Sequence, residues 1–369
     1  MNDTCSQLDL FAVDSKLVKL LPRAGASFRN PDVRLPVLRS ESGGGYYLEM
    51  RVEEDPEEIS EVGLTRRIPL ENISAEEWRE LKQQYDDLDL EACLSRGIKG
   101  LEQIEDLRFR RLTATLLTFL NPRQVQLVLY LYRAAAVEGT GAVVQFRSNE
   151  LLEVMGYNRT VDGGFHSVIR SQLHSDMMAL HRTELVYAEK TAIEGRMEAD
   201  IFIKSVLKII SFKIDNVQRD FDLDNAADYT YASADAYTVN LEFFQTPTRA
   251  DGDYVLFGNI DMHQDIGNSA EHDYGTKLLI YLAGRLKWDS PKDGQYLTIS
   301  RRTLHKNLEL FGKNSSRNNK LFWRTVDDLT AKGFVLSARE LPGKRKSNVL
   351  VEFQINPEKI RLHSGKSTS

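Results

Sequence analysis

Two stretches of this chain, residues 121–214 and 274–355, predict the same succession of elements, and that repetition limits the possible folds more than any other feature. In each stretch a helix with an apolar face precedes a short strand, a second helix, a turn, a third helix and two strands. A helix-turn-helix that is followed by a strand hairpin is the winged variant of that motif. The sequence therefore predicts an α+β fold with two tandem winged-helix domains.

Capping residues mark the helix ends in the second stretch. Ser300 is placed to cap a helix that ends at Gly312, and Gly333 stands where a glycine is expected after the third helix. The hairpin that follows is the expected wing. The predicted elements are helices over 274–286, 301–311 and 316–332 and strands over 295–299, 334–339 and 349–355.

The first stretch has weaker boundaries. Asn121 and Pro122 form a good helix start, and Ser148 is placed to cap the second helix. In the third helix we expect Phe165 and Val168 to point inward. Two further helices are predicted over 149–155 and 165–182, with strands over 142–146, 185–191, 201–214, 237–244 and 254–262.

The rest of the chain completes the predicted organisation. An acidic run and three consecutive glycines precede residue 70 and indicate a partly ordered acidic N-terminal arm with one short strand. Helical patterns over 75–85 and 88–117 follow, and an acidic insertion at 215–236 interrupts the first winged-helix domain. We divide the chain into the arm, a helical extension, two winged-helix domains and a polar tail, at 1–70, 71–120, 121–262, 263–361 and 362–369.

Charge is distributed unevenly along the chain. The 369 residues carry a net charge of −6, yet residues 273–361 hold 18 Lys and Arg against 9 Asp and Glu, a net charge of +9. Residues 1–120 hold 16 against 23, a net charge of −7. A basic domain joined to acidic ones suggests a polyanion partner for the basic domain.

The third helix of the second domain is the predicted DNA-reading element. Arg317, Lys320 and Arg324 fall on one face of it, opposite an apolar face that can pack on the domain. A helix of this kind fits the major groove of double-stranded DNA, and its N-terminal end approaches the bases. Further DNA contacts are expected from residues at that end: Lys313, Asn314, Asn318 and Asn319.

Two other sets of residues are weaker candidates. Lys344, Arg345 and Lys346 cluster at the predicted wing tip, where they could bind phosphates or enter a minor groove. The same cluster would also suit an ordinary solvated loop. In the first domain the third helix is expected to expose a polar face that contacts either DNA or a partner, formed by Ser167, Arg170, Ser171 and His174.

Catalytic and metal-binding patterns are absent from the sequence. Asp220, Asp222 and Asp224 alternate as in a calcium loop, but Asn225 and Tyr231 replace the glycine and glutamate that such a loop needs. A phosphate-loop ending at 365–367 lacks its first glycine. Two cysteines are too few for a disulfide framework or a four-Cys zinc site. We therefore expect no enzyme, no cofactor and no metal.

No targeting or membrane signal is visible either. The first ten residues contain no Lys or Arg, and no apolar run approaches the roughly 20 residues of a membrane span. We expect a cytoplasmic protein with no membrane association.

Residues 121–361 resemble the plasmid replication initiators that bind repeated origin sequences, or iterons. The resemblance rests on the tandem element order, the closing basic wing, and the helix-then-glycine phrases at 151–156 and 304–312. Gln7-Leu8-Asp9-Leu10-Phe11 also looks like the opening of some bacterial initiators. The long insertion departs from a compact initiator.

The resemblance implies a protein that binds direct repeats at an origin as a monomer, recruits host replication proteins, and associates with a plasmid or the nucleoid. In it the C-terminal winged helix looks like the principal reader. Arg317, Lys320 and Arg324 would lie on bases or adjacent phosphates, and Lys344, Arg345 and Lys346 on the backbone. The N-terminal winged helix would aid dimerisation. A winged-helix transcription regulator is the alternative, and a scaffold that no longer binds DNA is a third.

Overall fold

The computed structural model describes most of the chain. The described residues are 11–27, 30–41, 45–53, 64–70, 73–95, 98–138, 141–193, 196–214, 233–244, 254–257, 273–286, 295–311, 314–342 and 349–363. Most of the predicted acidic insertion, residues 215–232, lies outside them, including the calcium-like Asp220, Asp222 and Asp224. Residues 7–10 and the tail after 363 also lie outside the described residues.

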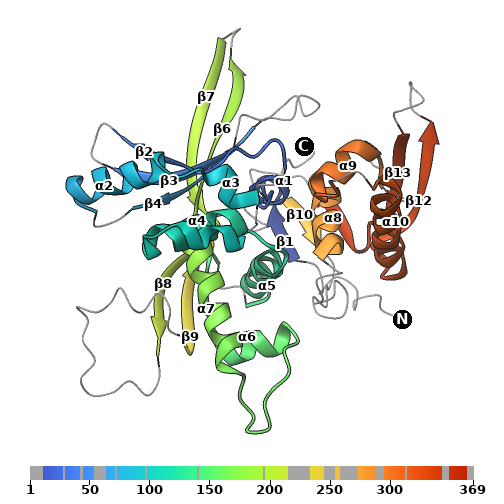
Figure 1. Ribbon diagram of the computed structural model, residues 1–369. Helices are drawn as coiled ribbons and strands as arrows, with labels where there is room; N and C mark the ends of the chain where they lie inside the picture. Colours follow the sequence, from blue (N-terminus) through green and yellow to red (C-terminus); the bar gives the residue numbers. More distant parts are fainter. Residues whose placement is uncertain are drawn as a thin grey trace. The chain divides into compact units, whose positions relative to one another are not determined.

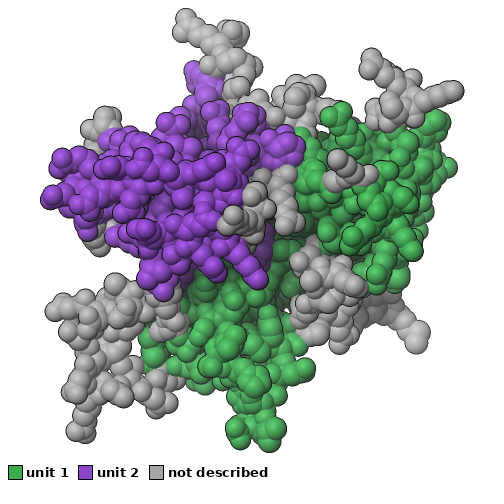
Figure 2. Space-filling model, in the orientation of Figure 1, with its two compact units in different colours: residues 1–22, 122–176, 209–369 green, residues 23–121, 177–208 purple. Residues whose placement is uncertain are grey.

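The fold is α+β, as predicted, and its contacts divide the chain into two compact units that interleave along the sequence (Figure 2). Unit 1 contains Met1–Pro22, Pro122–Asp176 and Ile209–Ser369, and unit 2 contains Arg23–Asn121 and Met177–Lys208. Both segments predicted as winged helices have most of their elements in unit 1. The boundary that we predicted at residue 262 therefore does not separate two units.

The second segment, residues 273–355, has the element order predicted for a winged helix (Figure 1). Its sheet has the order β11-β13-β12 and is antiparallel throughout. Its apolar core includes Leu278, Leu304, Phe322 and Phe353, all buried. The elements are α8 (Asp273–Gly284), β11 (Gln295–Ser300), α9 (Arg301–Asn307), α10 (Ser315–Ala331), β12 (Val335–Pro342) and β13 (Val349–Ile355).

The capping predictions hold in this segment with one exception. The Ser300 hydroxyl accepts a hydrogen bond from the Thr303 N–H, and Gly333 follows α10 with a φ of +76°. Helix α9, however, ends at Asn307 and not at Gly312. The left-handed residue that ends it is Glu309, with a φ of +56°, a conformation that is uncommon outside glycine.

The first segment has the same sheet order, β5-β9-β8, as the second segment's β11-β13-β12. Ser148 is the first residue of α6 and not its cap, because its hydroxyl donates to the Ala234 carbonyl oxygen. The elements are α5 (Pro122–Glu138), β5 (Val143–Arg147), α6 (Ser148–Val154), α7 (Ser167–Arg182), β8 (Lys208–Lys213) and β9 (Ala236–Asn240).

The wing strands of this segment differ from our prediction. Residues 185–191 and part of 201–214 form a separate hairpin, β6 (Glu184–Ile193) and β7 (Arg196–Ser205), which belongs to the sheet of unit 2. Strands β8 and β9 take the place of the wing. The acidic residues that we predicted as an insertion thus connect the two wing strands.

A small sheet completes unit 1. It has the order β1-β10-β14, formed by β1 (Phe11–Asp14), β10 (Tyr254–Phe257) and β14 (Ile360–His363). Helix α5 packs against β1 and α8, and α8 packs against β14. Residues from both ends of the described chain therefore join the two winged-helix segments in one unit.

Unit 2 is built on a five-stranded antiparallel sheet of order β2-β3-β4-β6-β7. Residues 11–24, 37–40, 46–52 and 64–69 form regular elements, where we had predicted one short strand in the arm. Helix α1 (Ser15–Ala24) lies mostly in unit 1 and ends in unit 2. The further elements of unit 2 are β2 (Val37–Ser40), β3 (Tyr46–Val52), β4 (Leu64–Pro69), α2 (Ala75–Asp86), α3 (Leu90–Ser95), η1 (Ile98–Gln103) and α4 (Leu107–Thr118).

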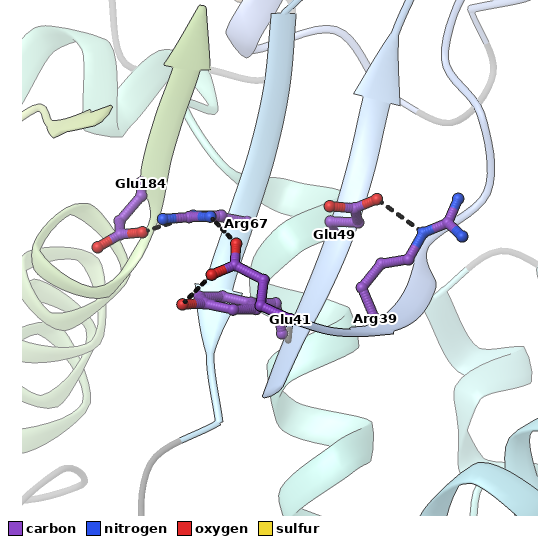
Figure 3. A network of polar contacts seen from close by, with 6 residues as sticks. Arg39, Glu41, Glu49, Arg67 and Glu184 are labelled. Carbon is purple, nitrogen blue, oxygen red and sulfur yellow. Dashed lines mark hydrogen bonds and ion pairs between the residues drawn. The ribbon is translucent and has the colours of Figure 1, made fainter. Parts of the chain in front are cut away.

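The two faces of this sheet differ in character. The buried residues of the inner face are apolar apart from Arg66, whose side chain is fully buried and donates to the carbonyl oxygens of Ala24 and Ala26. Those carbonyls lie at and just beyond the C-terminal end of α1, where the helix dipole favours a cation. On the outer face Arg67 lies between Glu184 and Glu41 (Figure 3).

Candidate nucleic-acid interface

Helix α10 is fixed to its domain by a cap and an apolar face. The Asn314 side chain accepts a hydrogen bond of 3.0 Å from the backbone N–H of Arg317 and so starts the helix. Phe322, Val326 and Leu329 are buried on the inner side. Because these residues point inward, the helix presents its opposite face to solvent.

That opposite face is basic. Arg317, Lys320 and Arg324 are all exposed, one to two turns apart on the helix. Spacings of three and four residues place side chains on the same side of an α-helix. The structure thus brings together the three residues that the sequence indicated as the recognition face. Lys313 lies outside the described residues.

The amide side chains near the start of α10 make structural contacts. The Asn318 side-chain NH₂ donates to the Leu310 carbonyl oxygen at 3.0 Å, which ties α10 to the chain that follows α9. Asn319 accepts from Arg301 at 3.4 Å. Together with the Asn314 cap, these two contacts fix the position of the helix.

Arg301 connects three elements of the segment. It is the first residue of α9, it donates to Asn319 on α10, and it forms an ion pair of 2.7 Å with Glu340 on β12. The start of α9, the N-terminal half of α10 and the wing strand therefore meet around one side chain. An exposed arginine, Arg302, lies next to this point. Sequence reasoning missed Arg302, although its position two residues after the Ser300 cap, in the first turn of α9, was a usable signal.

The wing itself is an antiparallel hairpin with one register shift, between Val335 and Ser337, and its described arginine is paired with a carboxylate. Arg339 on β12 pairs with Glu352, its cross-strand neighbour on β13, at 2.6 Å. The last described pair of the hairpin is Pro342 with Val349. The wing tip, with Lys344, Arg345 and Lys346, lies between them and outside the described residues.

Helix α7 of the first segment offers a different surface. Ser167 and Ser171 are exposed as expected, and so is Val168, at 76%, which we had predicted to point inward. Arg170 is half-buried and forms an ion pair with Asp235. Two serines and a valine are thus exposed on this face, and they are uncharged where α10 is basic.

His174 is not part of that surface, so the expectation that it is exposed was wrong. Its side chain is fully buried, and its Nδ1 shares a hydrogen bond of 2.7 Å with the Tyr237 hydroxyl on β9. Its ring also packs edge-on against Phe212 on β8. A helical wheel of α7 could not predict this burial, because the residues that cover His174, Phe212 and Tyr237, lie more than 35 positions later in the sequence.

The sheet of the first segment carries a hollow of about 450 Å³ on its surface. The aromatic side chains in its wall are Phe146, Phe212 and Tyr237, and burial raises the pKa of the Tyr237 hydroxyl. Arg147 and Lys213 are exposed at the same hollow. Glu150 lines the hollow as well, so its wall carries charges of both signs beside the aromatic rings.

Two general searches concern the described residues alone. Among them, no three His, Cys, Asp or Glu side chains converge as metal ligands would. None of the helices that they form has the length and apolar character needed to cross a membrane.

No family model matches the chain, and no curated protein matches it. Two solved structures align over nearly the whole chain at 10% identity, both of domains 2 and 3 of RctB. For the SeMet derivative the TM-score is 0.42, with 92% of this chain and 98% of that chain covered. For the RctB fragment 155–483 the TM-score is 0.36, with 91% of this chain and 96% of that chain covered. Likenesses at these scores do not establish a family.

Proposed function

We propose that this chain is a non-catalytic, sequence-specific DNA-binding protein that initiates plasmid replication at direct repeats in an origin. The observation that supports this most is the exposed basic face of α10, formed by Arg317, Lys320 and Arg324 on a helix whose other side is fixed in the domain core. A helix that enters the major groove needs this combination.

The neighbouring contacts favour the same surface. Arg301 and Arg339 are both engaged by carboxylates, those of Glu340 and Glu352. The three basic residues on α10 and Arg302 on α9 are exposed. Arg or Lys on α10 would read guanine edges, and Arg302 would contact a phosphate on the flanking backbone.

The tandem organisation supports an initiator over a single-domain regulator. The two segments share one sheet order and lie in one compact unit, so a single chain has two helices, α7 and α10, available for successive grooves. We propose that α10 reads the repeat and that α7 adds weaker contacts through Ser167 and Ser171. Recruitment of host replication proteins is part of the same proposal.

Binding by the full-length chain to a fragment that carries direct repeats tests this function. We expect nanomolar binding that weakens steeply with salt, because phosphate contacts release counterions. Arg317→Ala and Lys320→Ala should each weaken specific binding by roughly 1 to 3 kcal/mol, and non-specific binding much less. Arg79→Ala removes an exposed arginine on α2 and is the matched control.

Two results would contradict the proposal. Folded protein that shows no salt-sensitive DNA binding would exclude a DNA-binding function. Equal losses from Arg79→Ala and Arg317→Ala would show that binding depends on total charge and that α10 is not the reading helix.

A further inference from the structure

Strand β7 is the edge of the unit 2 sheet. Of the strands that the structure describes, only β6 pairs with it, through ten consecutive residue pairs with no register shift. Strand β4 covers only the first three residues of β6, from Glu184 to Val186. Beyond that point β6 and β7 continue as a two-stranded ribbon, which Figure 1 shows extending past β2, β3 and β4.

This edge lacks most of the usual protections against pairing. Natural sheet edges are blocked by proline, by bulges, by short strands or by charged side chains, lysine above all. Strand β7 is ten residues long, contains no proline and keeps an unbroken register, and a single lysine is among its four charged residues. Its outward backbone N–H and C=O groups are therefore presented in a regular row.

The outer face of the ribbon is apolar beside that edge. Ile201 is 71% exposed and Ile203 is 51% exposed, and their cross-strand partners on β6 are Ala188 and Val186. On the same face, nearer β4, the sheet is polar and its charges are paired with one another, as in the contact of Arg67 with Glu184 (Figure 3). The exposed isoleucines thus form a local apolar strip at the edge.

The sequence of β7 is complementary to itself in an antiparallel arrangement. If Phe202 of one chain lies opposite Phe202 of another, Asp200 falls opposite Lys204 and Ile201 falls opposite Ile203. The two-fold symmetry makes each of these pairs occur twice. Opposite charges and apolar side chains that face each other across antiparallel strands stabilise the pairing.

Other registers are less complementary. With Ile201 at the centre, Asp200 falls opposite Phe202 and Ile203 falls opposite Ala199, although Glu198 then meets Lys204. A parallel, in-register arrangement would place Asp200 beside Asp200. The two antiparallel registers offer the same number of ion pairs, and the pairing of Ile201 with Ile203 favours the one centred on Phe202.

We propose that two copies of this chain associate through their β7 strands, antiparallel and centred on Phe202, to form one continuous ten-stranded sheet. The exposed isoleucines of both chains then form one apolar strip on the outer face. The interface involves only unit 2, so it does not depend on the DNA-binding role proposed for α10.

Charge-reversal variants of the full-length chain test the register. Asp200→Lys and Lys204→Asp each convert two attractive pairs into two repulsive ones, and each should weaken self-association about tenfold or more. The double variant restores complementary charges and should recover the dimer. An equimolar mixture of the two single variants should form a heterodimer, because lysines at 200 and 204 then face aspartates at 204 and 200.

Sedimentation equilibrium measures the association, and circular dichroism and thermal melting show whether each variant is folded. The substitutions alter an exposed and a half-buried surface residue, so folding should persist. A wild-type chain that stays monomeric at all soluble concentrations would overturn the proposal. So would a dimer that Asp200→Lys leaves intact, since that would indicate another surface or the register centred on Ile201. Failure of the mixture to associate would exclude the proposed register.

Discussion

The guanidinium of Arg123 and the carboxylate of Asp176 form two hydrogen bonds, with Nε to Oδ2 at 2.6 Å and Nη2 to Oδ1 at 3.0 Å. The Gln124 side chain donates to the same carboxylate at 3.1 Å. Asp176 is only 4% exposed in its side chain, whereas Arg123 is 35% exposed. These contacts fix the first turn of α5 to α7 within the first winged-helix segment.

Loss of this arginine should be costly. Arg123→Ala would leave the Asp176 carboxylate buried without its cation, so we expect the free energy of unfolding to fall by roughly 3 to 5 kcal/mol. Urea unfolding followed by circular dichroism measures this. Arg159→Ala is the matched control, because the pair of Arg159 with Glu153 is exposed and should contribute less than about 1 kcal/mol. Similar losses in both variants would show that the burial of Asp176 does not determine the cost.

Gly100 has no room for a side chain. A Cβ atom at this position would lie 1.7 Å from the Cys93 carbonyl oxygen, so the close approach of η1 to α3 requires glycine. Gly100→Ala should lower the free energy of unfolding by more than about 2 kcal/mol, since backbone must move to admit the methyl group. Gly164→Ala should change it by less than about 0.5 kcal/mol, because the nearest atom to its Cβ would be 3.8 Å away. Equal melting temperatures for the two variants would contradict this assignment.

Protonation of His181 should destabilise unit 2. Burial, together with the positive charges of Lys208 and Arg182, lowers the pKa of His181 from 6.5 to about 4. The unfolded chain therefore binds a proton more readily than the folded one. The stabilisation is complete above pH 6.5 and is lost as the pH falls from 6.5 towards 4.

The loss over that range should be about 1 to 3 kcal/mol, because the side chain keeps some exposure to solvent. Urea unfolding at pH 7.5, 6 and 5 measures it. His181→Gln removes the titrating group and should flatten this part of the profile. An unchanged pH dependence in the variant would mean that other groups cause it.

The sequence predicted local elements better than their partners. Ser300, Gly333 and the apolar positions of α10 act through neighbours within a few residues, so the order of elements in the second segment was predicted almost completely. The β6–β7 hairpin was misassigned to the wing because alternating apolar residues predict a strand but do not name the sheet that it joins. Its partner, β4, lies more than 110 residues earlier.

In the candidate site, too, the features that depend on local sequence were predicted and those that depend on distant residues were not. The basic face of α10 follows from helical spacing alone, and the structure places its three residues as expected. His174 and Arg170 were misplaced because β8 and β9 cover them, and those strands follow in the sequence only after the β6–β7 hairpin. Arg301 connects its neighbours through an ion pair with Glu340 on β12, and no local sequence pattern predicts that contact.

The tandem arrangement predicts the shape of the DNA footprint. Each third helix occupies one major-groove segment, and segments on one face of B-DNA recur every 10 to 10.5 base pairs, about 34 to 36 Å. A single chain that uses α7 and α10 should therefore protect about two turns of one direct repeat, in two zones offset by one turn. The zone under α10 should tolerate base changes least, because its side chains are charged and reach base edges, whereas α7 presents uncharged residues.

Ser167→Glu together with Ser171→Glu should remove the weaker zone by repelling phosphates and leave the stronger one, while Ala75→Glu on α2 should change neither. Hydroxyl-radical footprinting, with the protein-to-DNA stoichiometry measured in parallel, decides the matter. A symmetric footprint on an inverted repeat that requires two chains would instead support a transcription regulator and exclude monomeric reading of a direct repeat.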